Sequence, residues 1–185
     1  RSVGIFYFLW LQTPGEILDL SRILAANPDN PRFGARGAFH WWGQPLFGYY
    51  RSDDPFVIRK HAQMLKDAGV DWLAFDVSNA LTYDDTVEAI GRVFESIRVR
   101  GGLTPQFAHL LNSRHVEVVG RLEQRLYRPG VREPLWFRWQ GRPLLLSPFE
   151  GLEPDTLKFF CVRQSWAWTD PRGWFGDGRD KWPWL

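Results

Sequence analysis

Two carboxylates in this chain follow apolar runs of the kind that form buried strands. Asp76 ends the run VDWLAFD, and Glu150 follows the run PLLLSPF. Glycoside hydrolysis needs two carboxyl groups roughly 5 to 10 Å apart, and adjacent strand ends can supply that separation. We therefore predict Asp76 as the first catalytic candidate and Glu150 as the second. The alternative is that Asp76 only bonds backbone amides in its own turn and that Glu150 is a solvated loop residue.

Aromatic side chains are the compositional outlier, with 11 Trp, 14 Phe and 5 Tyr, and many lie in segments that Gly and Pro interrupt. Flat rings stack on the C–H faces of sugars while carboxylates and amides bond the hydroxyls, so this mixture favours a carbohydrate groove. Rings that merely close the ends of a large core are the open alternative. The predicted substrate-binding residues are His40, Trp41, Trp42, Tyr49, Tyr50, Asn79, His109, Arg163, Gln164 and Trp166.

Several of these polar candidates have a second interpretation that the sequence leaves open. His40 and His109 can each bond a sugar hydroxyl, or each can be a packed residue that bonds a backbone carbonyl. Arg163 precedes Trp166 near the end of a possible strand, and its guanidinium suits a carboxylate such as that of a uronic acid. Solvent exposure is the alternative for Arg163. His61 falls on the apolar stripe of a predicted helix, so we expect it to be structural.

Charge and motif content argue against several classes of function. The 23 basic and 21 acidic residues are scattered and give a net charge of +2, which does not favour a nucleic-acid partner. The four His lack H-x-H or H-E-x-x-H spacing, and neither a calcium loop nor a glycine-rich phosphate loop occurs, so we expect no metal and no cofactor. A G-x-S-x-G elbow is also missing. The single cysteine, Cys161, excludes an internal disulfide, and no apolar run reaches the roughly 20 residues of a membrane span.

Apolar runs and amphipathic stretches alternate along the chain. Residues 3–11 are apolar without alternation, as in a strand that is covered on both faces. Pro55 begins a predicted helix, with cap candidates at 52–54, and Gly69 ends it. The other expected elements are a helical pattern at 17–24, a long loop at 27–45, strands at 70–77 and 104–111, helices at 84–100 and 116–127, a hairpin at 135–147, and a possible fifth strand at 157–166.

These repeated strand–helix units predict an α/β fold with a parallel sheet and right-handed crossovers. Since no phosphate loop follows a strand, we favour a (β/α)8 TIM barrel over an open doubly wound sheet. A complete barrel takes about 250 residues and eight strands, whereas about five βα units are visible here. We therefore expect one barrel domain over residues 1–185 that is incomplete and belongs to a longer protein. The given sequence shows no signal-peptide pattern, and the location of the protein, secretion included, stays open.

Three blocks of the chain resemble a known group of proteins. The blocks are GYYRSDDPFVIRKHAQMLKDAGVDWLAFDVSNA, TPQFAHLL and LWFRWQGRPLLL. They look like the bacterial barrel proteins grouped around glycoside hydrolase families 71 and 99, in which a helix ending in DAGVD precedes a strand with an FDVTN-like turn. The similarity runs from about Gly4 to Leu185, and the first block is its most specific part.

The resemblance implies a (β/α)8 barrel that acts on carbohydrate or binds it. In the endo-mannosidase members of that group the catalytic carboxylates lie in a later W-x-E-W-x-E-type segment, which this chain lacks, so that pair cannot be transferred to residues here. Two functions therefore remain open. The first is a glycoside hydrolase that cleaves a poly- or oligosaccharide, and the second is a non-hydrolytic carbohydrate-binding or glycan-biosynthesis protein on the same scaffold.

Overall fold

A computed structural model of the chain describes residues 2–11, 17–164 and 182. Its strands form one mixed sheet, in which β1, β2, β3, β5 and β6 pair in parallel and β4 pairs with β5 in the antiparallel sense. This confirms the predicted α/β class and the mostly parallel sheet, while closure into a barrel stays a prediction. The strands are β1 (Gly4–Tyr7), β2 (Trp72–Asp76), β3 (Gln106–Leu110), β4 (Arg138–Trp139), β5 (Arg142–Leu146) and β6 (Cys161–Arg163).

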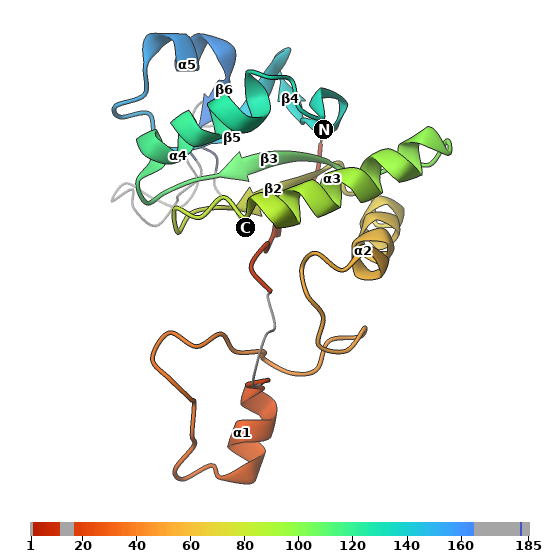
Figure 1. Cartoon of the computed structure of the whole chain (residues 1–185), viewed down its shortest axis with the longest axis vertical. Coiled ribbons are helices and arrows are strands. Elements are labelled where there is room, and N and C mark those ends of the chain that lie inside the picture. The colour runs from red at the N-terminus through yellow and green to blue at the C-terminus, as the bar shows by residue number, and fades with distance from the viewer. Residues whose placement is uncertain (1, 12–16, 165–181, 183–185) are drawn as a thin grey trace.

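Helices connect the parallel strands, as a series of βα units requires. Figure 1 shows β3 running between α3 and α4, and it shows α1 set well apart from the sheet. None of the helices in the described part of the chain has the length and apolar character needed to cross a membrane. The helical segments are α1 (Leu20–Ala26), α2 (Pro55–Asp67), α3 (Asp84–Val99), α4 (His115–Leu122), the π-helical turn η1 (Glu123–Tyr127), the 3-10 turn η2 (Glu133–Leu135) and α5 (Pro154–Phe159).

Helix α2 begins and ends where local chemistry predicts. The Asp54 carboxylate accepts hydrogen bonds from the backbone N–H of Phe56 at 2.8 Å and of Val57 at 3.2 Å, and Pro55 occupies the first turn. Gly69, with φ of +80°, follows the helix in the left-handed conformation that glycine adopts without strain. Of the cap candidates at 52–54, Asp54 is therefore the cap.

The register of the strands divides the sheet into two faces. Leu73 pairs with Phe107 and Phe75 with His109, and these side chains lie among those of helices α2, α3 and α4. We call this side the helix face. The opposite side, which we call the far face, is apolar too, because strands of a parallel sheet are covered on both sides. Its core residues are Trp72, Ala74, Ala108, Leu110, Phe137, Leu144 and Leu146, with Phe6, Trp139 and Trp182 packed against them.

One aromatic stack fixes the far face. The rings of Trp72 and Phe137 lie parallel, with centroids 4.9 Å apart. Gly4, on the neighbouring strand β1, leaves room for the Trp72 ring, since a Cβ atom at this position would overlap the indole. A bare backbone at Gly4 is therefore what lets the indole lie against β1.

The possible strand at 157–166 begins later than predicted. Pro154 starts α5, which extends to Phe159, and the strand β6 covers only Cys161–Arg163 among the described residues. Proline in the first turn of a helix costs no hydrogen bond, so Pro154 is compatible with the helix start that precedes β6.

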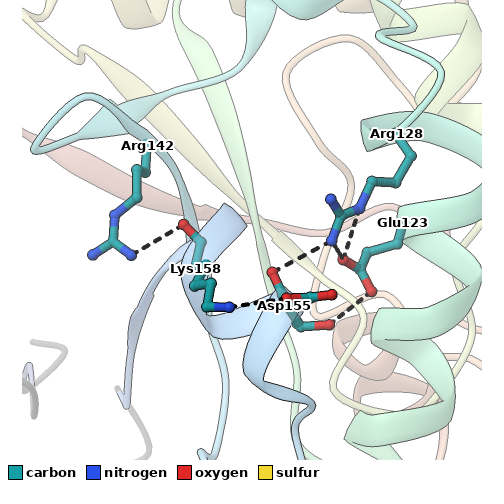
Figure 2. Close-up of polar contacts among 6 residues, drawn as sticks. Glu123, Arg128, Arg142, Asp155 and Lys158 are labelled. Atoms are coloured by element: carbon teal, nitrogen blue, oxygen red, sulfur yellow. Dashed lines mark hydrogen bonds and ion pairs between the residues drawn. The ribbon is translucent and has the colours of Figure 1, made fainter.

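A polar junction joins η1 to α5 (Figure 2). The Glu123 carboxylate accepts hydrogen bonds from the Thr156 hydroxyl at 2.9 Å and from the Arg128 guanidinium at 2.8 Å. The same guanidinium reaches the backbone carbonyl of Asp155, and Arg142 donates to the carbonyl of Lys158. Because Thr156 is buried, these bonds satisfy polar groups that would otherwise lack partners.

Two helix glycines give a matched test of the packing around α3. At Gly120 in α4 an added Cβ meets nothing within 4 Å, so Gly120→Ala should stabilise the fold by about 0.5–1 kcal/mol through helix propensity. At Gly91 in α3 the same methyl would collide with the Arg132 side chain, which pairs with Glu88 and Glu95. Gly91→Ala should therefore bring no gain or a loss. Urea unfolding of both variants measures this, and equal stabilisation would contradict the packing.

Candidate functional site

One row of residues crosses the sheet at the carboxyl ends of its strands. Asp76 pairs with Leu110, Leu110 with Leu146, and Leu146 with Arg163, so these four residues share one level of the far face. We call them the carboxyl row. Neighbouring strands lie about 4.8 Å apart, which puts Asp76 and Arg163 roughly 14 Å apart along the sheet. The row therefore has a carboxylate at one end, a guanidinium at the other, and an apolar floor between them.

Asp76 is half-buried and keeps one carboxylate oxygen outside its own turn. Its Oδ1 accepts a hydrogen bond from the backbone N–H of Ser78 at 3.0 Å. A bond of this kind, within its own turn, is the non-catalytic alternative that the sequence left open for Asp76. No described group bonds Oδ2. The turn bond orients the carboxylate, and Oδ2 remains able to accept a hydroxyl or to carry a proton.

Aromatic rings continue the far face past the end of β1, beside Asp76. Phe6 pairs with Ala74, so Phe8, two residues further along, reaches the level of Asp76. The ring centroids of Phe6 and Phe8 are 5.2 Å apart, and so are those of Phe8 and Trp10. Phe8 is half exposed. Sequence reasoning placed Phe8 and Trp10 inside a strand and did not select them, although their spacing of two residues assigns them to one face.

Arg163 at the other end of the row is buried and held by its neighbours. Its Nη2 donates to the Gln140 side-chain carbonyl at 3.2 Å, its Nη1 donates to the carbonyl of Val162, and the guanidinium lies 5.7 Å from the Trp182 ring centroid. The backbone carbonyl of Gln164 accepts from the N–H of Trp182 at 2.7 Å. The predicted position of these two residues at a strand end agrees with the structure, and Trp166 lies outside the described residues.

Two of the predicted site residues, Glu150 and His109, do not lie in the carboxyl row. Glu150 is exposed on the turn after β5, and its backbone carbonyl bonds Nε2 of His115 at 2.7 Å, at the start of α4. That contact draws the turn towards the helix layer. His109 is fully buried on the helix face, where its Nδ1 lies 2.8 Å from the Tyr127 hydroxyl. The structure therefore does not bring His109 to Asp76, and the pairing of Asp76 with Glu150 stays a prediction.

The aromatic loop before α2 packs largely against itself. Trp41 is 6% exposed, and its ring centroid lies 5.5 to 5.6 Å from those of Phe39, Tyr49 and Tyr50. For Trp41 the packing interpretation of the loop rings therefore accounts for its position. Trp42 differs, since it is 87% exposed and remains available to stack on a ligand.

A buried carboxylate that sequence reasoning missed holds this loop to α1. Asp19, 2% exposed, caps α1 and accepts hydrogen bonds from the hydroxyls of Ser21 and Tyr49. These bonds, that of Ser21 first, lower the pKa of Asp19 to about 2. The D-x-S pattern at 19–21 before an apolar helix was the available signal for a cap, but it gave no hint of Tyr49.

The two remaining predicted residues have local partners. His40 is half-buried, and its Nε2 lies 2.6 Å from the carbonyl of Phe33. Asn79 donates to the Tyr83 hydroxyl at 2.5 Å and accepts from the backbone N–H of Leu81.

His61 packs as expected, since its Nδ1 bonds the Tyr7 hydroxyl at 2.9 Å. Within residues 2–11, 17–164 and 182, no group of three or more His, Cys, Asp or Glu residues could hold a metal ion.

The Asp19 anchor gives a test of how the loop is held. Because its pKa in the folded state is depressed, Asp19 contributes stability that is complete above about pH 3.8 and is lost as the pH falls towards 2. Tyr49→Phe should raise the pKa of Asp19 towards 3.8, as read from the carboxyl ¹³C shift in an NMR titration. Tyr50→Phe is the control, since no described bond joins that hydroxyl to Asp19. An unchanged Asp19 titration in Tyr49→Phe would refute this arrangement.

Comparison with known proteins gives a likeness of fold. No protein-family model and no curated protein matches the sequence. Among solved structures, the chain is similar to a GH99 endo-alpha-mannosidase from Bacteroides thetaiotaomicron in complex with bis-tris-propane, with a TM-score of 0.50 and 19% identity over 81% of this chain and 42% of that one. A second structure of the GH99 enzyme from this organism has a TM-score of 0.47 and 20% identity, over 80% and 45% of the two chains. The chain thus spans less than half the length of these relatives, and what it shares with the first is an α/β fold.

Proposed function

We propose that the carboxyl row, with the rings of Phe8 and Trp10 beside it, binds carbohydrate and that the protein is a glycoside hydrolase. The observation that carries this proposal is the position of Asp76. It ends a buried strand at the carboxyl edge of a parallel sheet, level with the half-exposed ring of Phe8. In α/β folds of this kind ligands bind beyond the carboxyl ends of the strands. A ring beside a carboxylate can stack on a sugar while the carboxylate bonds its hydroxyls.

The likeness of fold supports a choice of substrate. The GH99 structure that the chain resembles is described as an endo-alpha-mannosidase, so an oligosaccharide with internal α-mannosidic bonds is the first substrate to test. We propose further that the parallel sheet belongs to a (β/α)8 barrel, in which the far face is the interior. In such barrels the active site lies at the carboxyl ends of the strands, where Asp76 stands.

The second carboxyl group decides between the two functions. Asp76 is the only carboxylate within the described strands, since the other members of the carboxyl row are Leu110, Leu146 and Arg163. Acid–base hydrolysis needs a partner, and Glu150 on the turn after β5 is the candidate. The direction of that turn, towards α4, favours the alternative of carbohydrate binding without hydrolysis. The alternative keeps the same site and the same ligand class.

Replacement of Asp76 by Asn separates these possibilities. Wild-type protein is mixed with an α-mannotetraose, its binding is measured by titration calorimetry, and its turnover by the release of reducing ends. If Asp76 is the acid or base, Asp76→Asn should lower turnover by about 100-fold or more and leave binding nearly intact. If binding falls with turnover, Asp76 anchors the sugar. Full activity in Asp76→Asn would remove it from the site.

A matched control and a failing result complete the test. Asp155→Asn removes a carboxylate from α5 that is 84% exposed and pairs only with neighbouring groups, so it should change neither measurement. Binding of the oligosaccharide without any turnover would support the non-hydrolytic alternative. If wild-type protein bound no α-linked mannooligosaccharide, the proposed substrate class would be wrong.

A further inference from the structure

A cavity lies on the helix face of the sheet, on the opposite side from the carboxyl row. It has a volume of about 310 Å³ and is lined by residues of α3, of α4 with η1, and by His109 of β3. Nothing in the proposed function uses it. Its walls combine four apolar side chains, Val87, Leu122, Leu126 and Val131, with charged ones at its edges. This volume suits a small ligand with a short apolar body.

The floor of the cavity carries a buried imidazole with one free nitrogen. His109 is fully buried, its Nδ1 bonds the Tyr127 hydroxyl, and its Nε2 has no hydrogen-bond partner among the described residues. Burial lowers the pKa of His109 to about 3, so the ring is neutral at ordinary pH. A buried nitrogen without a partner costs stability unless a ligand or a water bonds it.

The tautomer of His109 follows from Tyr127. The Tyr127 hydroxyl is fully buried, and Nδ1 of His109 is its only described hydrogen-bond partner. The hydroxyl hydrogen therefore has one acceptor to reach, and donation to Nδ1 leaves the imidazole proton on Nε2. The π-helical turn η1 ends at Tyr127 and places this hydroxyl over β3, and turns of this kind recur at functional sites. His109 lines the cavity, and in this tautomer its unpartnered Nε2 carries the N–H donor.

A guanidinium supplies a second donor. Arg121 in α4 donates from Nη2 to the carbonyl of Ala80 at 2.7 Å, and its Nε is buried without a described partner. The other two guanidinium groups that line the cavity are already paired, Arg125 with Asp84 at 2.7 Å and Arg132 with Glu88 and Glu95. Arg121 is therefore the one lining guanidinium with no carboxylate partner among the described residues.

From these two free donors and the apolar walls, we propose that the cavity binds a small monocarboxylate with a short alkyl body. The carboxylate oxygens accept from Arg121 Nε–H and His109 Nε2–H, and the alkyl body packs against the apolar side chains. The paired carboxylates of Asp84 and Glu88 at the edge, together with Asp85, disfavour a dianion such as phosphate. A monoanion with an apolar tail matches both the donors and the walls.

Hexanoate is the probe for this site, and 1-hexanol is the neutral comparison with the same chain. Binding is measured by titration calorimetry on the full chain. Hexanoate should bind and 1-hexanol should bind at least roughly tenfold more weakly, since a charge-assisted hydrogen bond contributes about 1.5–3 kcal/mol. Arg121→Lys keeps the charge but removes the Nε donor, and it should weaken hexanoate binding about tenfold or more. Arg114→Lys is the matched control and should leave binding unchanged, because Arg114 pairs with Glu117 and is not among the lining residues.

A measurement on the wild-type protein keeps the test independent of how the variants fold. Long-range ¹H–¹⁵N correlation of the imidazole should show the proton of His109 on Nε2, and this resonance should shift on addition of hexanoate. Three results would overturn the proposal. The first is a His109 proton on Nδ1, and the second is equal affinity for hexanoate and 1-hexanol. The third is a cavity that holds ordered water and no hexanoate when hexanoate is present at high concentration. None of these results bears on Asp76, so the site on the far face is tested separately.

Discussion

The parallel pairing of β2 with β3 is the constraint on which the rest of the structure depends. This register sets Asp76 level with Leu110 and Phe75 level with His109, so the two strands send their polar groups to opposite faces. A slip of one residue would move every side chain of a strand to the other face. A slip of β2 would carry Asp76 into the helix core, and a slip of β3 would carry His109 to the far face. One pairing thus determines which polar group meets solvent and which is enclosed.

The two faces of the sheet are packed by different kinds of contact. On the far face, aromatic rings such as the stacked pair of Trp72 and Phe137 pack on the sheet. On the helix face, polar side chains tie the layers together, as His109 does with Tyr127 and as Glu123 does with Thr156. Such bonds inside a core are directional, so they fix the position of one layer on another more narrowly than apolar contact alone. The cavity on this face borders the first of these contacts, since His109 is among its lining residues.

The sequence predicted the elements better than it predicted the faces. The cap at Asp54, the break at Gly69 and the βα alternation each follow from local chemistry, and the structure has them. The face of His109 could not be predicted, because apolar residues stand at consecutive positions around it and show no alternation from which to assign sides. The contact of Asp19 with Tyr49 could not be predicted from the sequence either, since Tyr49 is 30 residues away along an irregular loop. For the candidate site, therefore, Asp76 at a strand end was predictable, while Phe8 and Trp10 beside it depended on the register.

The Trp72 ring lies between two segments that do not pair with each other, Gly4 of β1 and Phe137 next to β4. The indole lies over the bare backbone of β1 on one side and stacks on Phe137, next to β4, on the other. Any side chain at Gly4 would push the indole towards Phe137. Glycine, tryptophan and phenylalanine at these positions thus form one packing unit that joins β1, β2 and the segment before β4, so that a change in one of them alters the space left for the others.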